Sequence, residues 1–120
     1  MKRIMTVDDS PSLRQMVALT LESAGYEVVE AADAHDAMSK LEGREFHLIL
    51  TDLNMPGTDG IELTRNLRSM PSYRFVPILL LTTESDKEKK LRGKAAGASG
   101  WIVKPFRPED LLATVKKVMR

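Results

Sequence analysis

The chain has 120 residues, 42% of them hydrophobic and 29% charged, with a formal net charge of +1 at pH 7. This length suits one hydrophobic core, so we expect a single domain over residues 1–120. The balanced charge argues against nucleic acid or an anionic membrane as a partner, and the absence of cysteine excludes disulfides, thiol catalysis and thiolate metal sites. Met1–Arg3 is basic, but two acids soon interrupt the apolar residues behind it, which fits neither a signal peptide nor a membrane span. We therefore expect a soluble, cytoplasmic protein.

The first elements in chain order are a strand, a helix and a second strand. Ile4–Val7 has strand character, and Ser10-Pro11 predicts a helix start, with serine as the cap and proline in the first turn. The residues of one buried stripe then recur at helical spacing until Gly25: Leu13, Met16, Val17, Thr20, Leu21 and Ala24. Tyr26–Ala31 predicts a strand whose two glutamates indicate a partly exposed sheet edge.

A second helix, a central strand and a third helix come next. Asp33 predicts the cap of the second helix, and Gly43 predicts its end. Phe46–Thr51 predicts a buried strand, because its apolar run shows no polar face and Pro-Gly turn residues follow closely. Asp59 and Glu62 have the spacing of a capping box and begin a third helix, which ends at the Pro-Ser pair of residues 71–72. The inward-facing residues are Ala34, Ala37, Met38 and Leu41 of the second helix and Leu63, Leu67 and Met70 of the third.

The fourth predicted helix differs from the others in its polarity. It follows a buried strand at Val76–Thr82, and Ser85 with Glu88 has the spacing of a capping box. Gly93 within this helix costs about 1 kcal/mol relative to alanine. Its few apolar residues are Leu91 and Ala95. A helix so short of apolar residues fits a surface that a partner covers.

A last strand and helix complete five repeats of strand and helix. Trp101–Val103 predicts the strand, and Pro108 opens the helix. The residues of that helix that face inward are Leu111, Leu112, Val115, Val118 and Met119. This alternation predicts an α/β fold, with a doubly wound parallel sheet, right-handed crossovers and helices on both faces.

Polar residues follow four of the predicted strands. They are Asp8 and Asp9 after the first, Asp52 after the third, Thr82 and Thr83 at the end of the fourth, and Lys104 with Pro105 after the fifth. The carboxyl ends of parallel strands share one rim, which is where ligands of open α/β sheets bind. Each residue alone has an ordinary interpretation at a helix start, a turn or a loop. Their coincidence at one rim predicts a functional site.

The predicted rim combines three carboxylates, hydroxyls and one ammonium. Three carboxylates in one place repel one another, and a hard divalent cation such as Mg²⁺ relieves that repulsion. Lys104 can neutralise a further negative charge, for which a phosphoryl group is the natural source. A carboxylate can act as the nucleophile and become an aspartyl phosphate. We therefore expect Mg²⁺-dependent phosphoryl chemistry at this rim.

Several motifs in this order resemble the receiver domain of two-component response regulators, and the match runs along the whole chain. They are Val7-Asp8-Asp9-Ser10, the stretch TDLNMPGTDG at residues 51–60, Leu81-Thr82-Thr83-Glu84, Gly97-Ala98-Ser99-Gly100 and Val103-Lys104-Pro105-Phe106. Within this family the chain is most similar to the stand-alone chemotaxis regulators of the CheY type. The resemblance implies a flavodoxin-like (βα)5 fold with strand order 2-1-3-4-5, the order for which flavodoxin and CheY are known.

The resemblance also implies a role for each charged residue of the rim. Asp52 matches the phosphoacceptor. Asp9 and Asp52 would supply carboxylate ligands of Mg²⁺, Asn54 would supply its backbone carbonyl, and Asp8 would hold metal-bound water. Lys104 matches the lysine that contacts a phosphoryl oxygen.

Further positions are implied to switch or tune the site. Thr82 matches the hydroxyl that turns toward the phosphoryl group, and Trp101 matches the aromatic residue that moves inward with it. The side chains at 54 and Glu84 occupy positions that tune acyl phosphate hydrolysis, and the peptide before Pro105 is expected to be cis. Two positions depart from the usual pattern, because Trp101 stands where Tyr or Phe is more usual and Thr83 where Ala or Gly is common. We expect the larger ring of Trp101 to limit its movement into the inward pocket, and the bulk of Thr83 beside the site to hinder small phosphodonors.

By this resemblance the chain is a stand-alone response regulator of a two-component phosphorelay. A histidine kinase donates a phosphoryl group to Asp52, and the domain catalyses only its own phosphorylation and dephosphorylation. The surface around the fourth helix, the last strand and the last helix then changes its affinity for a partner. The expected partner is a flagellar motor switch protein, while a phosphorelay intermediate or a regulator of a non-motor partner stays open. We expect a monomer that binds no nucleic acid and does not insert into a membrane.

Two other classes of protein compete with this interpretation. A phosphatase of the haloacid dehalogenase type also phosphorylates an aspartate at a strand end, but it needs an acid two residues later, where this chain has Asn54. Such an enzyme would also carry a cap-domain insertion. A flavodoxin-like FMN carrier would need hydroxyls and amides after the first strand, where Asp8 and Asp9 would instead repel phosphate. The residues disfavour both classes.

Overall fold

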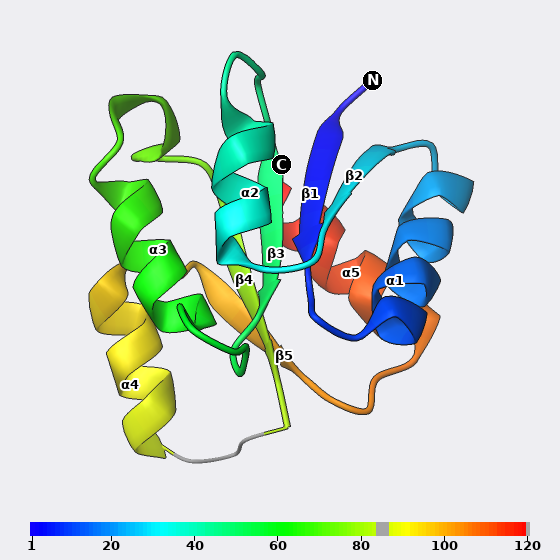
Figure 1. Ribbon diagram of the computed structural model, residues 1–120. Helices are drawn as coiled ribbons and strands as arrows, with labels where there is room; N and C mark the ends of the chain where they lie inside the picture. Colours follow the sequence, from blue (N-terminus) through cyan, green and yellow to red (C-terminus); the bar gives the residue numbers. More distant parts are fainter. Residues whose placement is uncertain (84–86, 120) are drawn as a thin grey trace.

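A computed structural model describes residues 1–83 and 87–119 of the chain, and its centre is one sheet of five parallel strands (Figure 1). The strands are β1 (Arg3–Val7), β2 (Glu27–Ala31), β3 (Leu48–Asp52), β4 (Ile78–Thr82) and β5 (Gly100–Val103). Their order in the sheet is β2-β1-β3-β4-β5, and every neighbouring pair is parallel. The expected doubly wound α/β fold with strand order 2-1-3-4-5 is confirmed, and so is the edge position of β2.

Helices follow the strands in turn and cover both faces of the sheet (Figure 1). They are α1 (Pro11–Ser23), α2 (Ala34–Leu41), α3 (Gly60–Arg68), α4 (Lys87–Ala96) and α5 (Pro108–Met119). Among residues 1–83 and 87–119, none of these helices has the length and apolar character needed to cross a membrane.

Each face of the sheet has its own apolar core. On one face, Met5 and Val7 pack with Leu63 and Leu67 of α3 and with residues of α2. On the other face, Ile4 packs with residues of α1 and α5. Successive strand residues therefore enter opposite cores, which explains why the central strands show continuous apolar runs rather than an alternating pattern.

Side-chain caps fix the starts of three helices where the sequence predicts them. The Ser10 hydroxyl accepts from the N–H of Leu13 at 3.4 Å, and Asp33 accepts from the N–H of residue 36 at 2.7 Å. Asp59 accepts from the N–H of Glu62 at 2.8 Å, while the carboxylate of Glu62 forms an ion pair with residue 65. The cap predicted at residue 85 lies outside the described residues.

A short 3-10 helix, η1 (Pro71–Tyr73), lies where the sequence indicates only the end of a helix. Tyr73 in it is 3% exposed. Its hydroxyl lies 3.2 Å from the backbone oxygen of Leu41 and 2.9 Å from that of Arg44. Tyr73 thereby ties the segment after α3 to the end of α2.

Helix α4 rests on the sheet through small residues rather than through the apolar residues singled out in the sequence. Leu91 is 68% exposed and Ala95 is also exposed, whereas Gly93 and Ala96 are buried. A Cβ atom at Gly93 would lie 2.8 Å from Cδ1 of Leu80 on β4. The glycine that lowers the helix propensity of α4 therefore also allows its close approach to the sheet.

Candidate functional site

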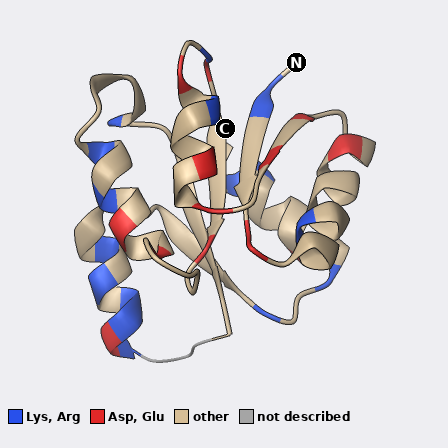
Figure 2. Ribbon diagram, viewed as in Figure 1, with Lys and Arg blue, Asp and Glu red and all other residues tan. Residues whose placement is uncertain are grey.

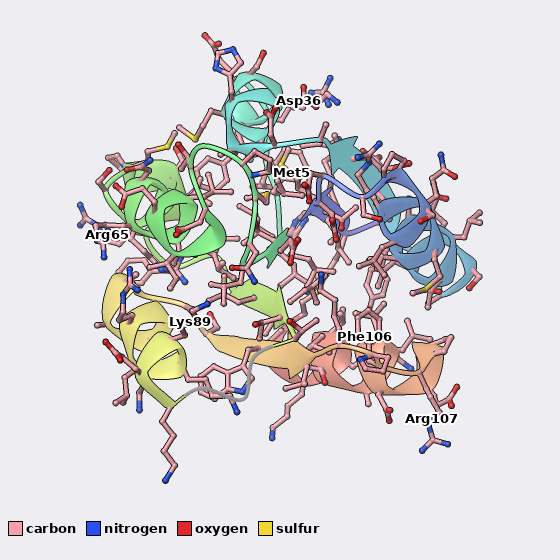
Figure 3. The ribbon with its side chains drawn as sticks, turned by 60° about the horizontal axis from the view of Figure 1, so that its bottom comes forward. Met5, Asp36, Arg65, Lys89, Phe106 and Arg107 are labelled. Carbon is pink, nitrogen blue, oxygen red and sulfur yellow. The ribbon has the colours of Figure 1, made fainter. Side chains whose placement is uncertain are left out.

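The polar residues predicted at the strand ends do meet at one rim of the sheet. Asp8 and Asp9 follow β1, and Asp52 is the last residue of the central strand β3. Ligand oxygens of these three carboxylates all lie within 4.8 Å of one another. Figure 3 turns the loops at this rim toward the reader, and Figure 2 shows acidic residues on the loop that leaves β1.

Lys104 supplies a positive charge directly to Asp52. The Nζ atom of Lys104 donates to Oδ1 of Asp52 at 2.9 Å, and the side chains are 18% and 8% exposed, respectively. The backbone N–H of Lys104 donates to the backbone oxygen of Thr82 at 2.7 Å, which fixes the lysine at the rim. The peptide between Lys104 and Pro105 is cis, as the family resemblance predicts. A phosphoryl group on Asp52 would therefore form beside an ammonium group.

Asp8 is the most deeply buried of the three acids, with 1% of its surface exposed. Its Oδ1 accepts from the N–H of Ser10 at 2.9 Å, whereas its Oδ2 is buried and has no hydrogen-bond partner among the described residues. Burial raises the pKa of the Asp8 carboxyl, and the charges of Asp52 and Asp9 raise it further. The Ser10 N–H and the Lys104 ammonium partly oppose this rise in pKa.

These three acids have the properties of a site for a hard cation. Among the described residues, Lys104 forms an ion pair with Asp52 alone of the three clustered acids, and the buried Oδ2 of Asp8 has no hydrogen bond, which carries an energetic cost. A divalent cation with oxygen ligands or bound waters satisfies such oxygens and offsets the repulsion. The residues present therefore fit a divalent cation.

Gly60 brings the start of α3 against the end of β3. Its N–H donates to the backbone oxygen of Leu53 at 2.9 Å. A Cβ atom at this position would lie 2.3 Å from the backbone oxygen of Asp52, a distance that no side chain tolerates. The sequence motif contains Gly60, but only the structure gives the reason for it: the close contact that positions Asp52.

The predicted switch residues lie together beside the acidic cluster. Thr82 is 3% exposed at the end of β4. A narrow pocket of about 10 Å³ separates it from Trp101 and is lined by Leu53, Leu80, Thr82, Lys89, Lys90 and Trp101. The Nζ atom of Lys90 lies 5.0 Å from the centre of the Trp101 ring, within the range of a cation–π contact. The half-buried Trp101 ring thus forms one wall of a pocket that reaches Thr82.

The remaining predicted residues lie at the margin of the site. Asn54 is exposed in the loop after β3, and Thr83 is exposed after β4. Thr83 and Pro105 line a shallow groove of about 360 Å³ with Leu13, Met16, Lys104 and Phe106. Glu84 lies outside the described residues. One contact of the site was not predicted: Arg14 of α1 donates to the backbone oxygen of Asp8, and its place off the apolar stripe of α1 gives no signal in the sequence.

The fold and this rim define a class of signalling protein, and comparison with known families agrees. The chain belongs to the response regulator receiver domain family, whose sequence model matches residues 4–116. It is thus a receiver domain of a two-component response regulator.

Both solved structures and curated sequences are similar to the chain. The chemotaxis protein CheY4 of Vibrio cholerae is 51% identical, with a TM-score of 0.96 and coverage of 98% of each chain. A receiver domain protein of Methanospirillum hungatei is 32% identical, with a TM-score of 0.92 and coverage of 99% of this chain and 94% of the other. The phosphate regulon transcriptional regulatory protein PhoB of Pseudomonas aeruginosa is 41% identical over 119 residues, 99% of this chain and 52% of that protein. The chain thus spans about half the length of the curated relatives that it matches.

Proposed function

We propose that the chain accepts a phosphoryl group on Asp52 from the phosphohistidine of a histidine kinase. The observation that carries this proposal is the surroundings of Asp52: the ammonium of Lys104 at 2.9 Å, and two further carboxylates with ligand oxygens within 4.8 Å. A carboxylate oxygen of Asp52 attacks the phosphorus atom, and the phosphorus–nitrogen bond to the imidazole breaks. The imidazole keeps the electron pair of that bond, and the product is an aspartyl phosphate.

The residues of the rim would prepare this transfer. Lys104 already contacts the carboxylate and can follow the negative charge onto the phosphoryl oxygens. Asp9 and Asp52 with the backbone carbonyl of Asn54 would hold Mg²⁺, and Asp8 would hold its water. When bound, Mg²⁺ supplies further neutralisation of phosphoryl charge. The buried Oδ2 of Asp8, which has no hydrogen-bond partner in the described part of the chain, supports this assignment.

We further propose that the domain catalyses only its own phosphorylation and dephosphorylation. A phosphatase that turned over substrates through Asp52 would need an acid at position 54, and the Asn54 amide cannot transfer a proton in that way. The side chains at 54 and at Glu84 are instead proposed to set how fast the acyl phosphate hydrolyses.

Thr82 and Trp101 would convert the phosphorylation into a change of surface. Thr82 is buried and lines the same pocket as Trp101, so a hydroxyl that turns toward the phosphoryl group would vacate space beside the ring. The proposal is that Trp101 follows and that the surface of α4, β5 and α5 changes its affinity for a partner. Figure 2 shows that α4 in this surface is rich in Lys and Arg.

The partner proposed first is a flagellar motor switch protein. The chemotaxis protein of Vibrio cholerae, 51% identical with 98% coverage of both chains, supports it. A phosphorelay intermediate or a regulator of a non-motor partner is the alternative, supported by relatives that are transcriptional regulators. The cytoplasmic location and the monomeric state expected from the sequence remain parts of this proposal.

The first experiment measures the intact mass of the protein after incubation with Mg²⁺ and a phosphoryl donor, either a phosphorylated histidine kinase or acetyl phosphate. We expect a phosphoryl adduct that requires Mg²⁺ and is absent from Asp52→Asn. The matched control is Asp110→Asn, which changes an exposed carboxylate on α5 and should leave the adduct intact. Beryllofluoride with Trp101 fluorescence separates a short-lived phosphate from an inactive site, because Trp101 is the single tryptophan. No adduct and no fluorescence response would refute the proposal.

A further inference from the structure

Arg14 joins the loop that carries Asp8 and Asp9 to the neighbouring strand β2. Its side chain is 16% exposed and lies near the N-terminus of α1. Its Nη1 donates to the backbone oxygen of Asp8 at 2.8 Å, and its Nε donates to Oε1 of Glu30 at 3.0 Å. A guanidinium is planar and its donors have fixed directions, so two acceptors on different segments fix its orientation.

The oxygen that Arg14 contacts belongs to the peptide group between Asp8 and Asp9. Because a peptide group is planar, fixing this oxygen also fixes the direction in which the chain enters Asp9. Other groups of Asp8 are held as well: its N–H donates to the backbone oxygen of Ala31 at 3.1 Å, and its Oδ1 accepts from the N–H of Ser10. Arg14 completes the set of contacts that orients both acids.

Glu30, the second partner of Arg14, belongs to a segment that is tied to α2. The Nζ atom of Lys40 donates to the backbone oxygen of Glu30 at 2.6 Å and to Oδ2 of Asp36 at 3.1 Å. That Oδ2 also accepts from the N–H of Ala32 at 2.9 Å. Asp36 is labelled on α2 in Figure 3. Contacts thus run from α2 through the end of β2 and Arg14 to the loop of the acidic cluster.

We propose that Arg14 is a positioning residue, which holds the peptide between Asp8 and Asp9 in the orientation that divalent cation binding requires. The inference rests on the proposed function, because it assumes that Asp9 and Asp52 bind the cation. The effect is one of position rather than of charge, since the contact is made to a peptide oxygen and the remaining ion pair is made to Glu30.

The test is Mg²⁺ titration of the full chain by calorimetry and by Trp101 fluorescence. Arg14→Gln removes both contacts and should weaken Mg²⁺ binding about tenfold, the usual scale for residues that orient metal ligands. Arg14→Lys keeps the charge but not the two fixed donors, so its affinity should fall as well. The matched control is Arg65→Gln, which removes an exposed ion pair on α3 and should leave the affinity unchanged.

A second readout needs no metal. In EDTA, the hydrogen-bonded amides of Asp8 and Ser10 should exchange hydrogen faster in Arg14→Gln than in the wild type, while the core strands keep their protection. At saturating Mg²⁺, phosphorylation of Asp52 in the variant should recover toward the wild-type rate, because the lost function is affinity. Glu30→Gln is a milder change, which weakens only the contact between Arg14 and Glu30, and it should cause a smaller loss of Mg²⁺ affinity. This variant provides the test if Arg14→Gln does not fold.

The outcomes separate this inference from the function on which it rests. A folded Arg14→Gln with wild-type affinity for Mg²⁺ and wild-type exchange at Asp8 and Ser10 would overturn the positioning role alone. Full affinity in Arg14→Lys would also overturn it, because charge would then be sufficient. A wild type that binds no Mg²⁺ would overturn the proposed metal site and the inference together.

Discussion

The acidic cluster should lower the stability of the protein when no cation is bound, and neutralising one acid should reverse this. The change is Asp8→Asn, which keeps an acceptor for the N–H of Ser10 and places an amide where the unpaired Oδ2 lies. Two unit charges separated by 4.8 Å repel by about 3.5 kcal/mol at an effective dielectric constant of about 20. The substitution removes this repulsion, but it also removes the attraction between Asp8 and Lys104, which offsets part of the gain in stability. We expect a net gain of about 2 kcal/mol, which raises Tm by about 8 °C for a domain of this size.

The assay is thermal and urea unfolding in EDTA, with Asp9→Asn as a comparison. Asp9 is exposed, so solvent screens its charge and the gain in stability should be smaller. A gain of equal size for Asp9→Asn and Asp8→Asn would show that burial is irrelevant. No gain for Asp8→Asn would refute the account of the cluster as a source of repulsion.

The burial of Asp8, together with the smaller effect of the charges of Asp52 and Asp9, also gives the stability a defined dependence on pH. The folded-state pKa of Asp8 is raised above its ordinary value of 3.8, so the native state holds this proton more tightly than the unfolded state. The corresponding stability is fully present below pH 3.8 and is lost as the pH rises through the folded-state pKa. In EDTA, the Asp8→Asn variant should lack this part of the pH dependence, which unfolding curves across the acid range can measure.

Three further substitutions and one control test contacts other than those between the carboxylates of the cluster. Gly60→Ala should cost about 2–3 kcal/mol and abolish the beryllofluoride response, because its Cβ atom would meet the backbone oxygen of Asp52; wild-type stability in urea would show that α3 can move away. Tyr73→Phe should cost about 1 kcal/mol by urea unfolding through loss of its buried hydroxyl contacts, and an unchanged midpoint would mean that water already serves those carbonyls. Arg68→Ala should cost about 3 kcal/mol, because its guanidinium donates to three backbone oxygens, those of Gly97, Tyr73 and Val76. Arg65→Ala, which removes an exposed ion pair, should cost less than about 0.5 kcal/mol, and equal losses for the two arginines would contradict this difference.

Local patterns were sufficient to predict the doubly wound parallel sheet and the polar residues that meet at its rim, whereas the strand order came from the family resemblance. Ser10, Asp33 and Asp59 mark helix starts because a short polar side chain there satisfies a free N–H of the first turn. The continuous apolar run before Asp52 reflects a strand buried on both faces, and parallel order then brings the carboxyl ends together. These features depend on residues that are close together in the chain, so they can be recognised from the sequence alone.

Contacts between distant segments could not be predicted in this way. Gly93 was interpreted as a weak point of a helix, whereas its effect depends on Leu80, a residue of another element. Leu91 was singled out as apolar, yet it is exposed because the small residues of α4 face the sheet. The contact of Arg14 with the Asp8 backbone depends on how α1 leaves β1, and an arginine on a polar face carries no periodic signal.

The repulsion at the rim also links ligand binding to stability. Asp8 follows β1 and Asp52 ends β3, and the apolar residues of these strands are buried in the cores on the two faces of the sheet. The cores therefore hold the two acids close together despite their like charges. A cation that binds between them removes the repulsion without any rearrangement of the cores, and binding to the native state alone stabilises it. Added Mg²⁺ should therefore raise the Tm of the wild type more than that of Asp8→Asn, and the difference between the two should narrow as Mg²⁺ increases. A difference that stays constant in this titration would mean that the cation binds away from the three acids.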